Sequence, residues 1–145
     1  MYTKNELLDF IGDDHLLDYR INERIRVLHN LLPKLKTNEL SEIEMVFITD
    51  SFINKLDIMS CDIEYYLDDN NEPLTDVKEF EAKFLKPLSP IKFTIRDYHD
   101  GRPYNDMDPA TVKYDMIKTI KCYTEAKEWM SKKGYKEGLW AEVYM

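Results

Sequence analysis

The chain contains only four glycines in 145 residues, too few to build a glycine-rich phosphate-binding loop. Gly12 and Gly134 follow expected helices, Gly138 precedes an expected strand, and Gly101 lies in a turn-rich segment. Phosphate-binding loops place several glycines before a helix because the backbone must approach the ligand closely. We therefore expect neither a P-loop nor a Rossmann-type nucleotide site.

Cysteines and recognisable catalytic motifs are also scarce. Cys61 and Cys122 are the only cysteines and do not form a C-x-x-C pair, so we expect reduced thiols and no structural zinc site. The sequence contains neither G-x-S-x-G nor H-E-x-x-H, the signatures of common hydrolases and zinc proteases. No family is recognisable, and the sequence favours a non-catalytic protein.

Long apolar runs are missing as well. No stretch approaches the roughly 20 apolar residues that cross a bilayer, and the first residues lack the basic start and apolar core of a signal peptide. We therefore expect a cytoplasmic protein with no membrane partner. A length of 145 residues, of which 43% are hydrophobic, indicates a single domain spanning 1–145.

Residues 41–68 predict a long central helix around which the rest of the chain is organised. Ser41 and Glu44 form a capping box at its start. Apolar residues then follow in steps of three or four, which places them on one helical face. They are Met45, Ile48, Phe52, Leu56, Met59, Ile63 and Tyr66. Because apolar and polar residues alternate near its end, a strand is an alternative for residues 57–67.

The other segments predict a mainly α fold of the α+β class. Helical patterns with start and stop signals occupy residues 3–12, 13–33, 76–87 and 108–134. Ile91, Phe93 and Ile95 alternate with polar residues, as do the apolar residues of 139–144. Alternation is typical of strands with one buried face. We therefore expect segments 91–96 and 139–144 to pair as a small antiparallel sheet.

Negative charge is concentrated in one segment. The formal net charge is −8, and residues 57–81 hold nine acids against the single base Lys78. Residues 109–145 hold seven lysines against five acids, which predicts an electrically asymmetric molecule. The lysines of the last helix are interspersed with acids, so direct binding to nucleic acid is not expected. A basic protein is the expected partner.

A second polar segment, residues 97–108, offers an alternative site. Its carboxylates and imidazole are candidate ligands for Mg²⁺ or Mn²⁺, which could activate a water for hydrolysis. The candidate ligands are Asp97, His99, Asp100, Asp106 and Asp108, with His99 and Asp106 as catalytic candidates. Asp is also frequent in turns, and Asp108 is a candidate N-cap of the last helix, so these residues have a structural explanation too.

The sequence therefore supports one leading hypothesis and two alternatives. The leading hypothesis is a small acidic binding or inhibitory protein that recognises a basic partner through the 57–81 surface, as a nucleic-acid mimic of phage or bacterial origin would. Its candidate contact residues are Asp62, Glu64, Tyr65, Tyr66, Asp68, Asp69 and Glu72. The alternatives are a metal-dependent hydrolase or nuclease using the 97–108 loop, and a structural subunit of an assembly, including a homo-oligomer.

Overall fold

The computed structural model describes residues 2–11, 21–70, 75–104 and 108–135, and the account below concerns these residues. Every regular element in these ranges is helical. In chain order they are α1 (Lys4–Ile11), α2 (Ile21–Leu31), α3 (Lys34–Thr37), α4 (Glu42–Asn70), α5 (Thr75–Phe80), the π-helical turn η1 (Glu81–Leu85), the 3₁₀ turn η2 (Lys86–Leu88), α6 (Ser89–His99) and α7 (Pro109–Lys132).

The predicted central helix is confirmed, and it continues through residues 57–67 without changing to a strand. The capping box at its start is present in both directions. The Ser41 N–H donates to Glu44 Oε1 at 2.9 Å, and the Glu44 N–H donates to Ser41 Oγ at 3.4 Å. These bonds satisfy two backbone donors that a helix start leaves open. At 29 residues, α4 is about 43 Å long.

Burial of α4 extends well beyond the predicted apolar stripe. Ile48, Phe52, Leu56, Met59 and Ile63 of that stripe are buried, as expected. Other faces of the helix are covered too, and the further buried residues between 43 and 60 are Ile43, Glu44, Val46, Phe47, Thr49, Ser51, Ile53, Asn54, Lys55, Ile58 and Ser60. A helix buried on all sides must be surrounded by other elements. α4 is therefore the centre of the fold.

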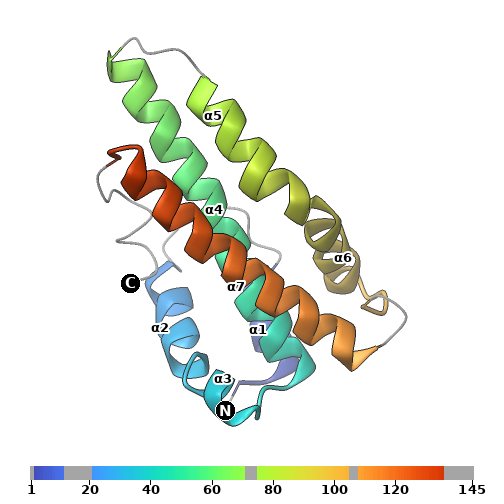
Figure 1. Ribbon diagram of the computed structural model, residues 1–145. Coiled ribbons are helices and arrows are strands. Elements are labelled where there is room, and N and C mark those ends of the chain that lie inside the picture. Colours follow the sequence, from blue (N-terminus) through green and yellow to red (C-terminus); the bar gives the residue numbers. More distant parts are fainter. Residues whose placement is uncertain (1, 12–20, 71–74, 105–107, 136–145) are drawn as a thin grey trace.

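Three long rods and a group of short helices make up the arrangement (Figure 1). α4 and α7 lie side by side and run in the same direction, and the rod formed by α5, η1, η2 and α6 runs back in the opposite direction. The rings of Phe52 and Tyr123 join α4 to α7, with centroids 5.0 Å apart. The short helices α1, α2 and α3 lie around the N-terminal half of α4.

The predicted limits of the last helix are also confirmed. Asp108 is the N-cap of α7, accepting a hydrogen bond from the Ala110 N–H at 3.0 Å, and Pro109 follows in the first turn. Gly134 has φ +87°, a left-handed conformation that glycine adopts without steric cost, and the chain leaves the helix there.

The predicted antiparallel sheet is wrong. Residues 91–96 lie within helix α6, and no strand occurs in the ranges that the structure describes; residues 139–144 lie outside them. The same residues carry a second pattern, in which Ile91, Ile95 and Tyr98 follow at steps of four and three and are all buried. Phe93, which a strand would bury beside Ile91, is 61% exposed and lies 5.7 Å from the Arg96 guanidinium. A run of six alternating residues is too short to distinguish the period of a strand from that of a helix.

The helix predicted over 76–87 does not end the rod, because two prolines near its end lie inside continuous helical structure. Pro87 stands in the first turn of η2 and Pro90 in the first turn of α6. Proline lacks a backbone N–H, but the first turn of a helical segment needs no such donor from it. The π and 3₁₀ turns between α5 and α6 accommodate the prolines without reversing the chain.

One buried ion pair connects α2 to α4. Arg24 Nη2 donates to Asp50 Oδ2 and, at 2.9 Å, to the Phe10 carbonyl of α1. Both charged side chains are largely shielded from water, with 6% and 13% exposed. Asn54 Nδ2 donates to the same carboxylate oxygen of Asp50 at 3.3 Å. This network holds α1, α2 and α4 together.

No described helix is both long enough and apolar enough to span a membrane.

We expect Ile95→Ala to lower the free energy of unfolding by about 3 kcal/mol because it removes buried methyl groups and leaves a cavity. Phe93→Ala on the same helix should cost less than about 1 kcal/mol, since that side chain is exposed. Urea denaturation followed by circular dichroism measures both. Equal losses would contradict the helical assignment of 91–96, because only a strand places both residues on one buried face.

Asp50→Ala should lower the free energy of unfolding by about 3 kcal/mol, because it leaves the buried Arg24 guanidinium without its carboxylate. The matched control is Asp57→Ala, which removes a more exposed pair with Lys92 at 3.3 Å and should cost about 1 kcal/mol or less. The double variant Arg24→Met, Asp50→Leu should recover most of the loss. A similar small cost for both single variants would show that the Arg24–Asp50 pair is not structurally important.

Candidate functional site

The acidic segment divides into two parts with different surroundings. We define the acidic turn as Cys61, Asp62, Glu64 and Tyr65 of α4. Cys61, Glu64 and Tyr65 are exposed and Asp62 is half-buried, with Tyr65 reaching 65% exposure. The other predicted contact residues, Tyr66, Asp68, Asp69 and Glu72, have side chains outside the part that the structure describes. The described acidic turn thus presents two carboxylates and a tyrosine ring on one stretch of helix.

The Cys61 thiol reports the electrostatic character of this turn. Partial burial raises the pKa of Cys61, and the carboxylates of Glu64, Asp57 and Asp62 raise it further. Negative charge near a thiol disfavours the thiolate, so the negative potential of these carboxylates acts on Cys61 in the same direction as its burial. The same potential would attract cationic side chains of a partner.

The acids of α5 hold the fold together. Asp76 accepts hydrogen bonds from Tyr135 Oη at 2.6 Å and from Lys133 Nζ at 3.5 Å. Glu79 accepts from Trp129 Nε1 at 3.3 Å and pairs with Lys133 at 3.4 Å and Lys83 at 3.4 Å. The Trp129 hydrogen bond and the neighbouring lysines lower the pKa of Glu79. These contacts fasten α5 to the C-terminal end of α7.

Composition alone does not separate these two uses of acidic residues. Residues 57–81 were predicted to form one surface, whereas Asp57, Asp76 and Glu79 are all paired with lysines of other segments. A usable signal was the basic end of the last helix, where Lys132 and Lys133 offer partners for acids elsewhere in the chain. Among the described residues, Asp62, Glu64 and Tyr65 stay predicted contact residues.

The alternative metal site is only partly within the described chain. Asp97 and His99 belong to the last turn of α6, and Asp100 follows as its C-cap. Asp97 pairs with Arg102 at 3.1 Å, and His99 Nδ1 lies 3.4 Å from Asp100 Oδ1. Asp108 caps α7, while Asp106 lies outside the described residues. Within the part of the chain that the structure describes, no three potential His, Cys, Asp or Glu ligands converge.

His99 and Asp100 instead line a polar cavity of about 300 Å³ between α6 and α4. Lys92 and Arg96 of α6 face it on the same side as His99, and Asp50 and Asn54 contribute from α4. Its carboxylates already have partners, since Asp50 binds Arg24 and Asp100 lies beside His99. Sequence reasoning missed this cavity because Asp50 and His99 are far apart in the chain and meet only through helix packing.

A buried lysine was also missed. Lys55 lies within α4 with its Nζ 4.6 Å from the centre of the Tyr123 ring, a favourable cation–π distance. Burial and the nearby Lys127 ammonium lower the pKa of Lys55 to about 8. A fraction of this amine is therefore neutral at physiological pH. The sequence signal was that Lys55 is the only basic residue of the central helix.

The comparisons supply no relative from which a role could be transferred. No family model, no curated protein and no solved structure matches the chain. Its function can therefore be inferred only from its own residues and their geometry.

Cys61 should be alkylated by the uncharged reagent iodoacetamide at pH 8 faster than Cys122. Burial raises the pKa of Cys122 to about 11, and its thiol donates to the Phe84 carbonyl at 3.3 Å. Glu64→Gln should accelerate Cys61 alkylation about twofold because it removes a charge that raises the Cys61 pKa. The control, Glu125→Gln, should leave the Cys61 rate unchanged, since Glu125 acts on Cys122. An unchanged Cys61 rate in Glu64→Gln would contradict the negative potential assigned to the acidic turn.

Proposed function

We propose that this chain is a non-catalytic binding or inhibitory protein of the cytoplasm that recognises a basic partner protein through the 57–81 surface, with the acidic turn at its centre. The observation that carries the proposal is the grouping of the Asp62 and Glu64 carboxylates with the exposed Tyr65 ring on one turn of α4. Carboxylates steer a cationic partner and fix its orientation, while a tyrosine supplies contact area at low entropic cost.

Helix energetics support a binding role for the acids near the end of α4. Asp68 and Asp69 belong to the last turn of this helix, where the dipole disfavours negative charge. Glu64 stands four residues before Asp68, a spacing that brings like charges together on a helix. Each effect costs a few tenths of a kcal/mol or somewhat more. Because local helix stability does not favour these acids, we attribute them to recognition of a basic partner.

A nucleic-acid-binding protein is the partner class we favour. Such proteins carry clustered Lys and Arg that normally contact phosphates, and a stretch of carboxylates can occupy the same surface. The net charge of −8 argues against direct binding of this chain to nucleic acid. The abundance of Lys, Asn, Ile and Tyr is in keeping with an AT-rich bacterial or phage genome. An inhibitor that blocks a nucleic-acid-binding cleft accounts for the charge without requiring a catalytic site.

Neutralising the acidic surface should abolish partner capture from a lysate of the source organism. The test variant carries five substitutions: Asp62→Asn, Glu64→Gln, Asp68→Asn, Asp69→Asn and Glu72→Gln. The matched control changes the same number of exposed acids elsewhere: Glu6→Gln, Asp9→Asn, Glu39→Gln, Glu125→Gln and Glu128→Gln. Quantitative mass spectrometry should show about a tenfold or greater loss of the main basic partner with the test variant.

The control should retain the partner within about twofold, because it has the same net charge as the test variant but an intact acidic turn. The captured partner should also elute as salt rises, since screening weakens charge pairs across an interface. Equal loss of the partner in both variants would show that overall net charge, and not the acidic surface, controls capture. Equal retention of the partner would exclude the acidic surface as the binding site.

A further inference from the structure

A second pocket, distinct from the polar cavity beside His99, lies at the opposite end of α4 from the acidic turn. It is formed by α3, the start of α4 and the first half of α7. It encloses about 250 Å³ and is lined mainly by apolar side chains. The apolar lining residues are Leu35, Leu40, Met45, Met116, Ile117 and Ile120. Ile117 is 52% exposed at this pocket, which shows that helix packing alone leaves apolar surface uncovered there. The pocket shares no residue with the acidic turn.

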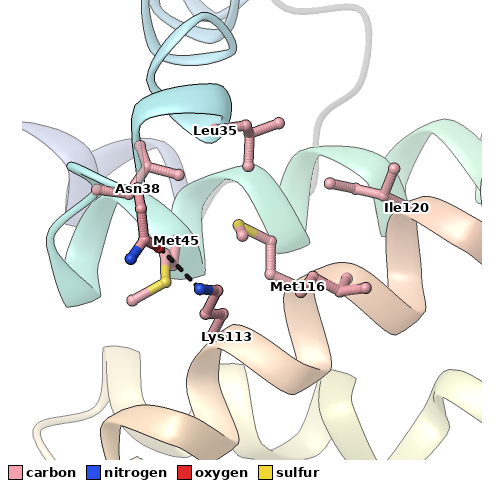
Figure 2. Close-up of a pocket in the computed structure, with 8 residues that line it drawn as sticks. Leu35, Asn38, Met45, Lys113, Met116 and Ile120 are labelled. Carbon is pink, nitrogen blue, oxygen red and sulfur yellow. Dashed lines mark hydrogen bonds between the residues drawn. The ribbon is translucent and has the colours of Figure 1, made fainter.

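Polar groups occur at one end of this pocket only. Lys113 and Asn38 stand at that end beside Met45, Met116 lies in the middle, and Ile120 lies at the opposite end (Figure 2). Lys113 Nζ donates to Asn38 Oδ1 at 2.8 Å. Asn38 is the C-cap of α3 with φ +58°, and this left-handed backbone, which asparagine tolerates, sets the position of its side chain beside Lys113.

The charge at this end is not matched by a carboxylate within the pocket. No acidic residue lines it, and the hydrogen-bond acceptor for Lys113 is the neutral amide of Asn38. Lys34, on the neighbouring α3, shows the contrasting case, because its ammonium pairs with Glu44 at 3.1 Å. The pocket therefore combines an apolar body with a cationic rim that has hydrogen-bonding capacity for an anion.

We propose that this pocket binds a medium-chain alkyl carboxylate. The carboxylate would accept hydrogen bonds from Lys113 Nζ and from the amide nitrogen of Asn38, and the alkyl chain would lie between Met45 and Met116 toward Ile120. A dry apolar cavity of about 150 Å³ already holds a benzene-sized molecule, so a cavity of 250 Å³ accepts a longer apolar group. Methionine side chains adapt their shape, which suits a flexible chain. This site is independent of the proposed partner surface.

Methionine methyl groups provide a direct test with sodium octanoate as the probe. Met45 and Met116 line the pocket, whereas Met59 and Met130 are fully buried elsewhere in the core and serve as internal references. In protein labelled with ¹³C at the methionine methyls, octanoate should shift the Met45 and Met116 signals saturably. The Met59 and Met130 signals should stay in place, which also shows that the fold is unchanged.

The head-group assignment is tested by a matched pair of lysine variants. Lys113→Gln should weaken octanoate binding about tenfold because it removes the charged hydrogen-bond donor. Lys118→Gln, on the same helix but not lining the pocket, should bind as the wild type does. Octylammonium, with the same chain and the opposite charge, should not bind. No saturable shift with octanoate, equal binding of octylammonium, or an unchanged affinity in Lys113→Gln would each overturn the proposal.

Discussion

The ion pair between Arg24 and Asp50 allows α4 to hold a charged side chain in the interior of the protein. A long helix that is covered on all sides must bury polar positions as well as apolar ones, and unpaired charges there are costly. Arg24 bridges Asp50 to the Phe10 carbonyl, and Asn54 completes the set. With the two charges paired, apolar contacts can surround the same stretch of helix. The network also holds α1 and α2 against α4.

The same constraint explains where candidate sites occur. α4 is covered on most sides up to Ser60 and becomes exposed at Cys61, so Glu64 and Tyr65 lie at the surface in the later turns. At the opposite end, α3 and the start of α7 leave an apolar pocket beside Met45. Two chemically different surfaces therefore lie at the two ends of one helix, one acidic and one apolar with a cationic rim.

Local signals in the sequence were sufficient to predict most of the helices. They were insufficient to predict which residues from distant segments pack against them. The capping box at Ser41 and the Asp108-Pro109 start of the last helix act within one turn, so both helix starts could be predicted. Residues 91–96 fit both periods, and packing against α4 decided in favour of the helix. The acidic segment was recognised from composition, but the pairing of Asp76 with Lys133 joins residues 57 positions apart. Neither this pairing nor the two pockets could be read from local spacing.

Site-specific photocrosslinking from Cys61 is the most direct test of the central claim that the acidic turn is a binding surface. A photoreactive group on Cys61, in a Cys122→Ala background, would be irradiated in a lysate of the source organism. The account predicts a dominant crosslink to one protein, at a segment rich in Lys and Arg. The same group on Ser131→Cys, an exposed position on α7, should give no such product in a background lacking both native cysteines. Crosslinking from position 131 but not from Cys61 would contradict the account.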